Sequence, residues 1–250
     1  MTMTMPLDGI QLFALLASVL VAAFVRGYSG FGFSAIVIAG ASLVITPAAL
    51  VPALFILEIV ASVRMLPSVR HQIDFPTFWP LFAGCVVGLP AGQYLLVHLP
   101  ADTIRVCLSI GILLSTALLW RGYNFGQKMT GPLAGLIGFL LGFGSGMASM
   151  GGLIAMAIFL GVNYPVPQTR AIFVAIFFAM YVYGVGISAL NGLITSTTLW
   201  IALVALLPLF IGIFLGQKKY LSASPESFRK LVLVLLTILA TIGIARVLLV

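Results

Sequence analysis

Long stretches without any charged side chain are the feature that most limits how this 250-residue chain can fold. Four such runs cover residues 27–57, 75–97, 129–169 and 171–217. A helix needs about 20 apolar residues to cross the hydrocarbon core of a bilayer, and each run reaches that length. Only 7% of the residues are charged, whereas about a quarter are charged in a soluble domain. The sequence therefore predicts an all-α, polytopic membrane protein embedded in a lipid bilayer.

The few charges also exclude some classes of function. The net charge is +7, but the basic residues are scattered singly through loops, so no nucleic acid is expected as a partner. The chain has no Gly-x-x-x-x-Gly-Lys-Ser/Thr motif for nucleotide phosphates and no Ser/His/Asp or His-Glu-x-x-His arrangement. We therefore expect no enzyme, no cofactor and no metal site.

Charges, prolines and glycines divide the chain into about 8 to 10 apolar segments in two comparable sets. We predict one integral membrane domain with a first repeat over residues 1–122, a linker over 123–130 and a second repeat over 131–250. The segments at 31–46 and 151–162 are shorter than a full crossing. They are half-helices or re-entrant arms, or they cross fully, and the sequence leaves this choice open.

Polar matches between the two halves indicate an internal duplication. Residues 88–93 resemble 212–217, and residues 100–105 resemble 224–229, with an acid and an Arg in register in the second pair. Lipid does not impose such polar matches on apolar segments, although chance similarity remains the alternative. The number of crossings in each half is odd whether or not the short segments cross. The two repeats are therefore predicted to be inverted relative to each other, as in many secondary transporters.

Most Lys and Arg residues fall on one side of this arrangement. By the positive-inside rule, that side is the cytoplasm, so the linker is cytoplasmic and both termini are periplasmic or extracellular. The basic residues concerned are Arg26, Arg64, Arg70, Arg121, Lys128, Arg170, Lys218 and Lys219.

Two glycine-rich clusters, at residues 27–34 and 142–152, are the strongest candidates for a functional site. Alternating glycines disfavour a regular helix, so each cluster predicts a helix break near mid-membrane. At such a break the free N–H groups of a half-helix attract an anion. A close-packed helix crossing is the structural alternative. The predicted substrate-binding residues are Arg26, Gly27, Tyr28, Ser29, Gly30, Gly32, Ser34, Gly142, Gly144, Ser145, Gly146, Ser149, Gly151, Gly152 and Arg170.

Three further polar residues are candidates for coupling or for lining a cavity. Glu58 is the only acid well inside an apolar segment, and it is either a proton-coupling group or the partner of Arg64. Gln93 and Gln217 recur after matching glycine pairs, and they line a cavity or mark the ends of spans. Aromatic residues near the first cluster, such as Phe31, are either gates or core.

Other glycines repeat every four residues and are expected to let helices approach closely. These are Gly84, Gly88 and Gly92 in one segment and Gly212 and Gly216 in another.

Two repeats that each open on a glycine-rich break, followed by a proline and a long helix, resemble the TauE/SafE sulfite exporter family, also called the toluenesulfonate uptake permease family. The likeness covers nearly the whole chain. It implies a multi-pass transporter of the bacterial inner membrane that exports small sulfur-containing anions such as sulfite, sulfoacetate or other organosulfonates. Alternating access is the implied mechanism, with proton coupling and the oligomeric state left open.

The first repeat departs from the family's glycine run, because Phe31 and Phe33 are interleaved in it. This departure makes the second repeat the better candidate for binding. An anion channel or pore, or a carrier of non-sulfur organic anions, is the alternative function.

Overall fold

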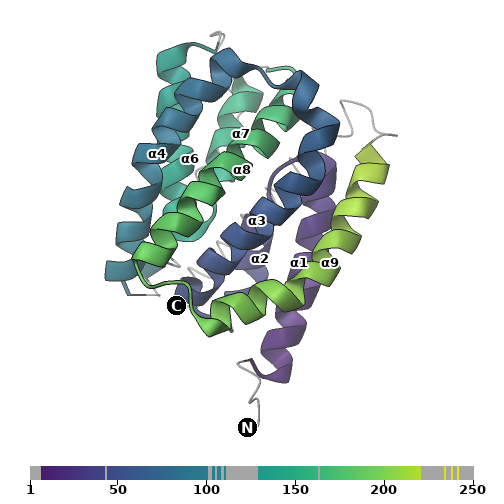
Figure 1. Cartoon of the computed structure of the whole chain (residues 1–250), viewed down its shortest axis with the longest axis vertical. Helices are drawn as coiled ribbons and strands as arrows, with labels where there is room; N and C mark the ends of the chain where they lie inside the picture. The colour runs from purple at the N-terminus through teal and green to yellow at the C-terminus, as the bar shows by residue number, and fades with distance from the viewer. Residues whose placement is uncertain are drawn as a thin grey trace.

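The computed structural model describes residues 7–42, 44–100, 103, 104, 106, 107, 110, 129–162, 164–220, 234, 238 and 241. Every regular element within this part of the chain is a helix, which confirms the predicted all-α fold (Figure 1). Most of residues 101–128 and 221–250, which include the ends of both predicted repeats and most of the linker 123–130, lie outside the described residues. The domain boundaries therefore stay predictions.

Six of the described helices are long and apolar enough to cross a membrane, so the chain is a multi-pass membrane protein. A short 3-10 turn, η1 (Arg70–Gln72), extends the second of them. The six are α1 (Gly9–Ser29), α3 (Pro47–Val69), α4 (Phe75–His98), α6 (Gly131–Ala148), α8 (Val166–Leu190) and α9 (Ser196–Tyr220).

Two helices are much shorter than a crossing, as the sequence predicts. α2 (Phe33–Ala41) has 9 residues and α7 (Gly151–Gly161) has 11. At the usual rise per residue they are about 14 and 17 Å long, roughly half of the hydrocarbon thickness. Each follows a long helix after a break of two or three residues.

α2 turns back along α1 and does not continue across the membrane. Gly40 packs so closely on α1 that a Cβ atom there would collide with the Ser18 hydroxyl. After α2, the Val44 carbonyl accepts a hydrogen bond of 2.9 Å from Gln11, at the start of α1. α1 and α2 therefore form a helical hairpin whose tip, called the first tip here, is residues 30–32.

α6 and α7 form a second hairpin of the same kind. Gly151 packs against the carbonyl of Leu141 on α6. The chain after α7 returns to the start of α4, where the Tyr164 hydroxyl donates a hydrogen bond to Asp74. The tip of this hairpin, called the second tip, is residues 149–150. Both short segments are thus re-entrant.

The long helices pair through glycines. In Figure 1, α4 lies beside α6 at one side of the bundle, α1 lies beside α9 at the other, and α3 and α8 lie between. A Cβ atom at Gly88 or Gly92 would collide with the backbone of α6, and one at Gly216 would collide with the backbone of α1. The predicted packing role of these glycines is confirmed, since missing side chains let the backbones touch.

Each glycine cluster contains a helix break, as predicted, but each break is much shorter than its cluster. Gly27 lies inside α1, and Gly142, Gly144 and Gly146 lie inside α6. Gly142 and Gly146 are four residues apart and face the backbone of α4, so their small size serves packing. Tertiary contact outweighs their low helix propensity, because backbone groups away from water must be bonded. The chain leaves the helix only at the two tips.

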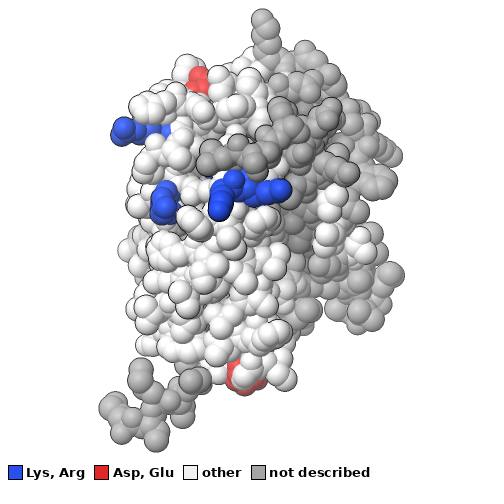
Figure 2. Space-filling view, turned by 90° about the vertical axis from the view of Figure 1, so that its right-hand side faces the viewer, with Lys and Arg blue, Asp and Glu red and all other residues white. Residues whose placement is uncertain are grey.

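Charged side chains leave a broad uncharged band on the face in Figure 2, where the Lys and Arg side chains gather toward one end. Arg64, Arg70, Lys218 and Lys219 are exposed. Arg26 and Arg170 also lie near span ends, in the last turn of α1 and near the start of α8, but they are only 0% and 5% exposed. Which end faces the cytoplasm stays a prediction.

Candidate functional site

A small cavity lies where the two tips meet the middle of α3 and α8. Gly32 and Ser34 line it from the first hairpin, and Ser149 and Gly152 line it from the second. Glu58 of α3 completes one wall. The cavity has room for about one water molecule in this conformation. The structure therefore brings together the two glycine clusters that lie far apart in the sequence.

Both short helices begin at this cavity. The backbone of Gly32, at the start of α2, is left-handed with φ 87°, and no side chain caps that helix start by a hydrogen bond. Ser149, just before α7, is left-handed too, with φ 57°. The first N–H groups and the helix dipole give each start a partial positive charge. Two such starts make the cavity favourable for a negative group.

At the start of α2, the negative group is Glu58. Its Oε1 accepts a hydrogen bond of 2.9 Å from Ser34 Oγ, and the Ser34 backbone N–H lies near the carboxylate. Its Oε2 lies 3.1 Å from Arg26 Nη2 and has no partner in hydrogen-bond geometry. The alternative that Glu58 pairs with Arg64 is wrong, because Arg64 is exposed and Arg26 is the partner.

Arg26 connects the first tip to its surroundings. The guanidinium donates to the carbonyl of Gly30 in the tip and, over 2.9 Å, to Ser62 Oγ on α3. Its Cζ lies 4.6 Å from the centre of the Phe177 ring on α8. A planar, permanently charged group can make all of these contacts together. Arg26 lies behind Glu58 and does not line the cavity.

At the start of α7, polar groups remain unpaired. The hydroxyls of Ser145 and Ser149 are buried and have no hydrogen-bond partner. The Tyr181 side chain on α8 is close enough to interact with both serines, but without forming hydrogen bonds of normal geometry. Buried hydroxyls are usually bonded, so this unpaired pair is a place where a ligand would gain contacts.

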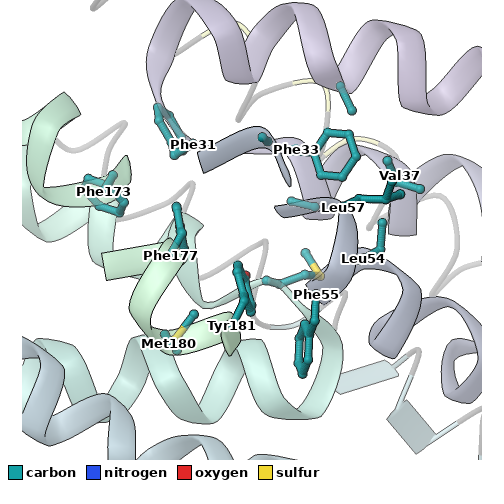
Figure 3. Packing of buried hydrophobic residues seen from close by; sticks show 14 of the residues in the cluster. Phe31, Phe33, Val37, Leu54, Phe55, Leu57, Phe173, Phe177, Met180 and Tyr181 are labelled. Atoms are coloured by element: carbon teal, nitrogen blue, oxygen red, sulfur yellow. The ribbon is translucent and has the colours of Figure 1, made fainter. Parts of the chain in front are cut away.

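Aromatic side chains of α8 form a column (Figure 3), and Phe177 and Tyr181 of this column line the cavity. Phe173, Phe177 and Tyr181 are spaced by four residues, and successive ring centres are 5.6 and 5.5 Å apart. Phe31 of the first tip reaches this column, 5.9 Å from Phe173. Sequence reasoning missed Phe177 and Tyr181, although the spacing of the aromatic residues within 173–181 was a visible signal.

Other predicted site residues lie outside the cavity. Arg170 Nη2 donates a hydrogen bond of 2.9 Å to the carbonyl of Gly27, and its Cζ lies 4.1 Å from the centre of the Tyr220 ring. Tyr28 packs edge-on against the same ring, at 6.1 Å. Ser29 Oγ donates over 2.8 Å to a carbonyl one turn earlier in α1 and over 2.9 Å to one in the first tip. These residues support the first tip from behind.

Gln93 and Gln217 do not line the cavity either. Gln93 Nε2 donates a hydrogen bond of 2.6 Å to Ser188 Oγ, and Asn191 donates to Gln93 Oε1 over 3.4 Å. Gln93 therefore ties α4 to the end of α8. The backbone of Gln217 packs near Gly27, where α9 meets α1.

Comparison with known proteins places the chain in a family. No curated protein and no solved structure gives a significant match. The sequence profile of one family matches residues 15–242, which is most of the chain and includes both hairpin tips. Members of that family are membrane transporters of sulfite-type anions. On this match and on its membrane-spanning helices, the chain belongs to the Sulfite exporter TauE/SafE family.

Proposed function

We propose that this protein is a secondary transporter that exports small sulfur-containing anions, such as sulfite, sulfoacetate or another organosulfonate, across the bacterial inner membrane. One observation carries the proposal: two half-helices start at the same buried cavity, where Ser149 has an unpaired hydroxyl. Helix starts and hydroxyls are the groups by which a protein holds an oxyanion without a full positive charge. Family membership supports the class of substrate.

Alternating access between two inverted repeats is the mechanism that we propose. The glycine contacts advance together along α4 and α6, and likewise along α1 and α9, so each pair runs in parallel. In each pair, the first helix of one half packs on a later helix of the other half. Such a reciprocal exchange is expected of inverted repeats, and the shared cavity lies between them.

Transport requires the cavity to change shape. A sulfite or sulfonate is larger than the single water for which the cavity has room. The two tips must therefore move apart toward one side of the membrane and then toward the other. Glu58 lines the cavity and is held by Arg26, so it is the group that we propose to carry a coupled proton.

Flux into proteoliposomes tests the substrate. Vesicles that contain the purified protein and are loaded with unlabelled sulfite should take up ³⁵S-sulfite by counterflow, and the rate should saturate with concentration. Sulfoacetate should compete, and acetate of the same concentration should compete much less. Equal indifference to all of these anions would contradict the proposal.

The same vesicles separate a carrier from its alternatives. Large unitary currents without counterflow would show an anion channel. Stronger competition by carboxylates than by sulfonates would show a carrier of non-sulfur organic anions. An imposed proton gradient should change the rate of sulfite flux if Glu58 couples transport to protons, and the variant Glu58→Gln should remove that dependence.

A further inference from the structure

We propose that the two helix starts at the cavity have different occupants. The chain's own Glu58 neutralises the start of α2, and a single transported oxyanion binds at the start of α7, with Ser149 and Tyr181 as its side-chain ligands. This inference rests on the proposed function, because it assigns the substrate of that same cavity to one of its two halves.

The start of α2 has no need of a ligand. Glu58 is 1% exposed, accepts a hydrogen bond from the side chain of Ser34 and lies near the backbone N–H of the same residue. Arg26 pairs with it from behind. A carboxylate in this position compensates the positive end of the helix, as a bound anion would. Ser34, although it lines the cavity, has already used its hydroxyl hydrogen.

The start of α7 is different in each of these respects. Among the described residues that line the cavity, Glu58 is the one acid, so no carboxylate stands at α7. Ser149 is 3% exposed, lines the cavity and has no hydrogen-bond partner. Tyr181 of α8 also lines the cavity and lies close to that serine. Two hydroxyl donors and the first N–H groups of α7 are therefore available to one oxyanion.

The negative charge of Glu58 then acts on the bound anion. Both groups line one small cavity, and like charges at such a distance repel strongly in a medium of low dielectric constant. The groups that face Glu58 are Arg26 from α1, Ser34 from α2 and Tyr181 from α8. Ser62, on the same helix as Glu58, accepts a hydrogen bond from the Arg26 nitrogen that pairs with the carboxylate. Arg26 offsets part of the repulsion. Removing the charge of Glu58 should therefore strengthen anion binding.

The test is equilibrium binding of ³⁵S-sulfite to the purified full-length protein and to a matched pair of serine variants. Ser149→Ala should weaken binding about tenfold or more, since it removes a hydrogen bond to a charged group. Ser34 lines the same cavity from the other hairpin, and the variant Ser34→Ala should change the affinity for sulfite less than about threefold. Tyr181→Phe should weaken binding about fivefold. The wild-type stoichiometry should be one anion per chain.

Glu58→Gln gives a second, opposite effect. Glutamine retains the size of the side chain and its bond to Ser34, and it should bind sulfite about tenfold more tightly. Equal losses in the two serine variants, or a stoichiometry of two in the wild type, would overturn the assignment even where sulfite is transported. A wild-type protein that binds no sulfite would instead overturn the proposed function. If Glu58→Gln does not fold, the comparison of Ser149→Ala with Ser34→Ala still tests which helix start binds the anion.

Discussion

The two hairpin tips occupy matching places in the chain but are held in different ways. The first tip contains two glycines with positive φ, and its carbonyls accept hydrogen bonds from Arg26 and Ser29. Two carbonyls of the first tip are thus bonded by buried side chains, although Arg26 Nε and Glu58 Oε2 nearby have no hydrogen-bond partner. The second tip places a serine in the left-handed region and leaves the hydroxyls of Ser145 and Ser149 without partners.

This difference shows that the same helical hairpin can be stabilised by the protein itself in one half of the chain and form a binding site in the other half. The first tip is fixed by the protein itself, including a carboxylate at its helix start. The second tip keeps donors unsatisfied, at a cost of about 1–3 kcal/mol for each buried group. Such a cost is typical of a site that gains its missing contacts from a ligand.

The largest effect is expected from removing Arg26. Arg26→Met leaves Glu58 buried without its cation, which should lower the free energy of unfolding by about 3–5 kcal/mol. Thermal unfolding in detergent measures this loss. Arg64→Met, at an exposed position, should change stability by less than about 0.5 kcal/mol. A small effect of Arg26→Met would show that the first tip does not depend on its buried ion pair.

Unlike the tips, the two glycine contacts should respond alike. Gly88→Ala brings a Cβ atom into the backbone of α6, and Gly216→Ala brings one into the backbone of α1. Each should destabilise the protein by about 1–3 kcal/mol, because packed helices must separate. Gly186→Ala meets no atom within 4 Å and is the control. Melting temperatures that fall in one variant only would contradict the equivalence of the two helix pairs.

Removing Arg170 should have an intermediate effect that acts through the first tip. Arg170→Ala removes the hydrogen bond to the Gly27 carbonyl and the contact with Tyr220. We expect sulfite binding to weaken about fivefold, since the displaced tip forms one wall of the cavity. Arg64→Ala should leave the affinity unchanged. Equal affinities in the two variants would refute a role for Arg170 at the site.

The smallest effect on stability, and the sharpest distinction between the tips, is expected for Ser149→Gly. Glycine adopts the left-handed backbone without strain, so the free energy of unfolding should stay constant or rise by up to about 1 kcal/mol. Sulfite binding should nevertheless fall, because the hydroxyl is lost. In contrast, Ser145 lies inside α6, and Ser145→Gly should lower the free energy of unfolding by about 0.5 kcal/mol. Unchanged sulfite affinity in Ser149→Gly would argue against a binding role for that serine.

Much of the site could be predicted from residue types. Glu58 and Arg26 are charges inside apolar stretches, and such charges need partners, so both could be selected without a structure. Their pairing could not, because the residues are far apart in the chain and Arg64 is much closer to Glu58. The residues at which each break falls within its cluster could not be predicted either, since Gly142 and Gly146 are helical whereas the second tip, residues 149–150, contains no glycine.

Local chemistry alone determined that the chain spans a membrane as helices, because long uncharged runs can satisfy their backbone groups in lipid only by helical hydrogen bonds. It also indicated that two segments are shorter than a full crossing, but it left open whether they cross, and only the structure shows both of them turning back. Only the tertiary structure determines which of the two helix starts is neutralised by the protein and which is left for a ligand. It depends on which helix start receives Glu58, and that contact forms when α3 packs against α1 and α2.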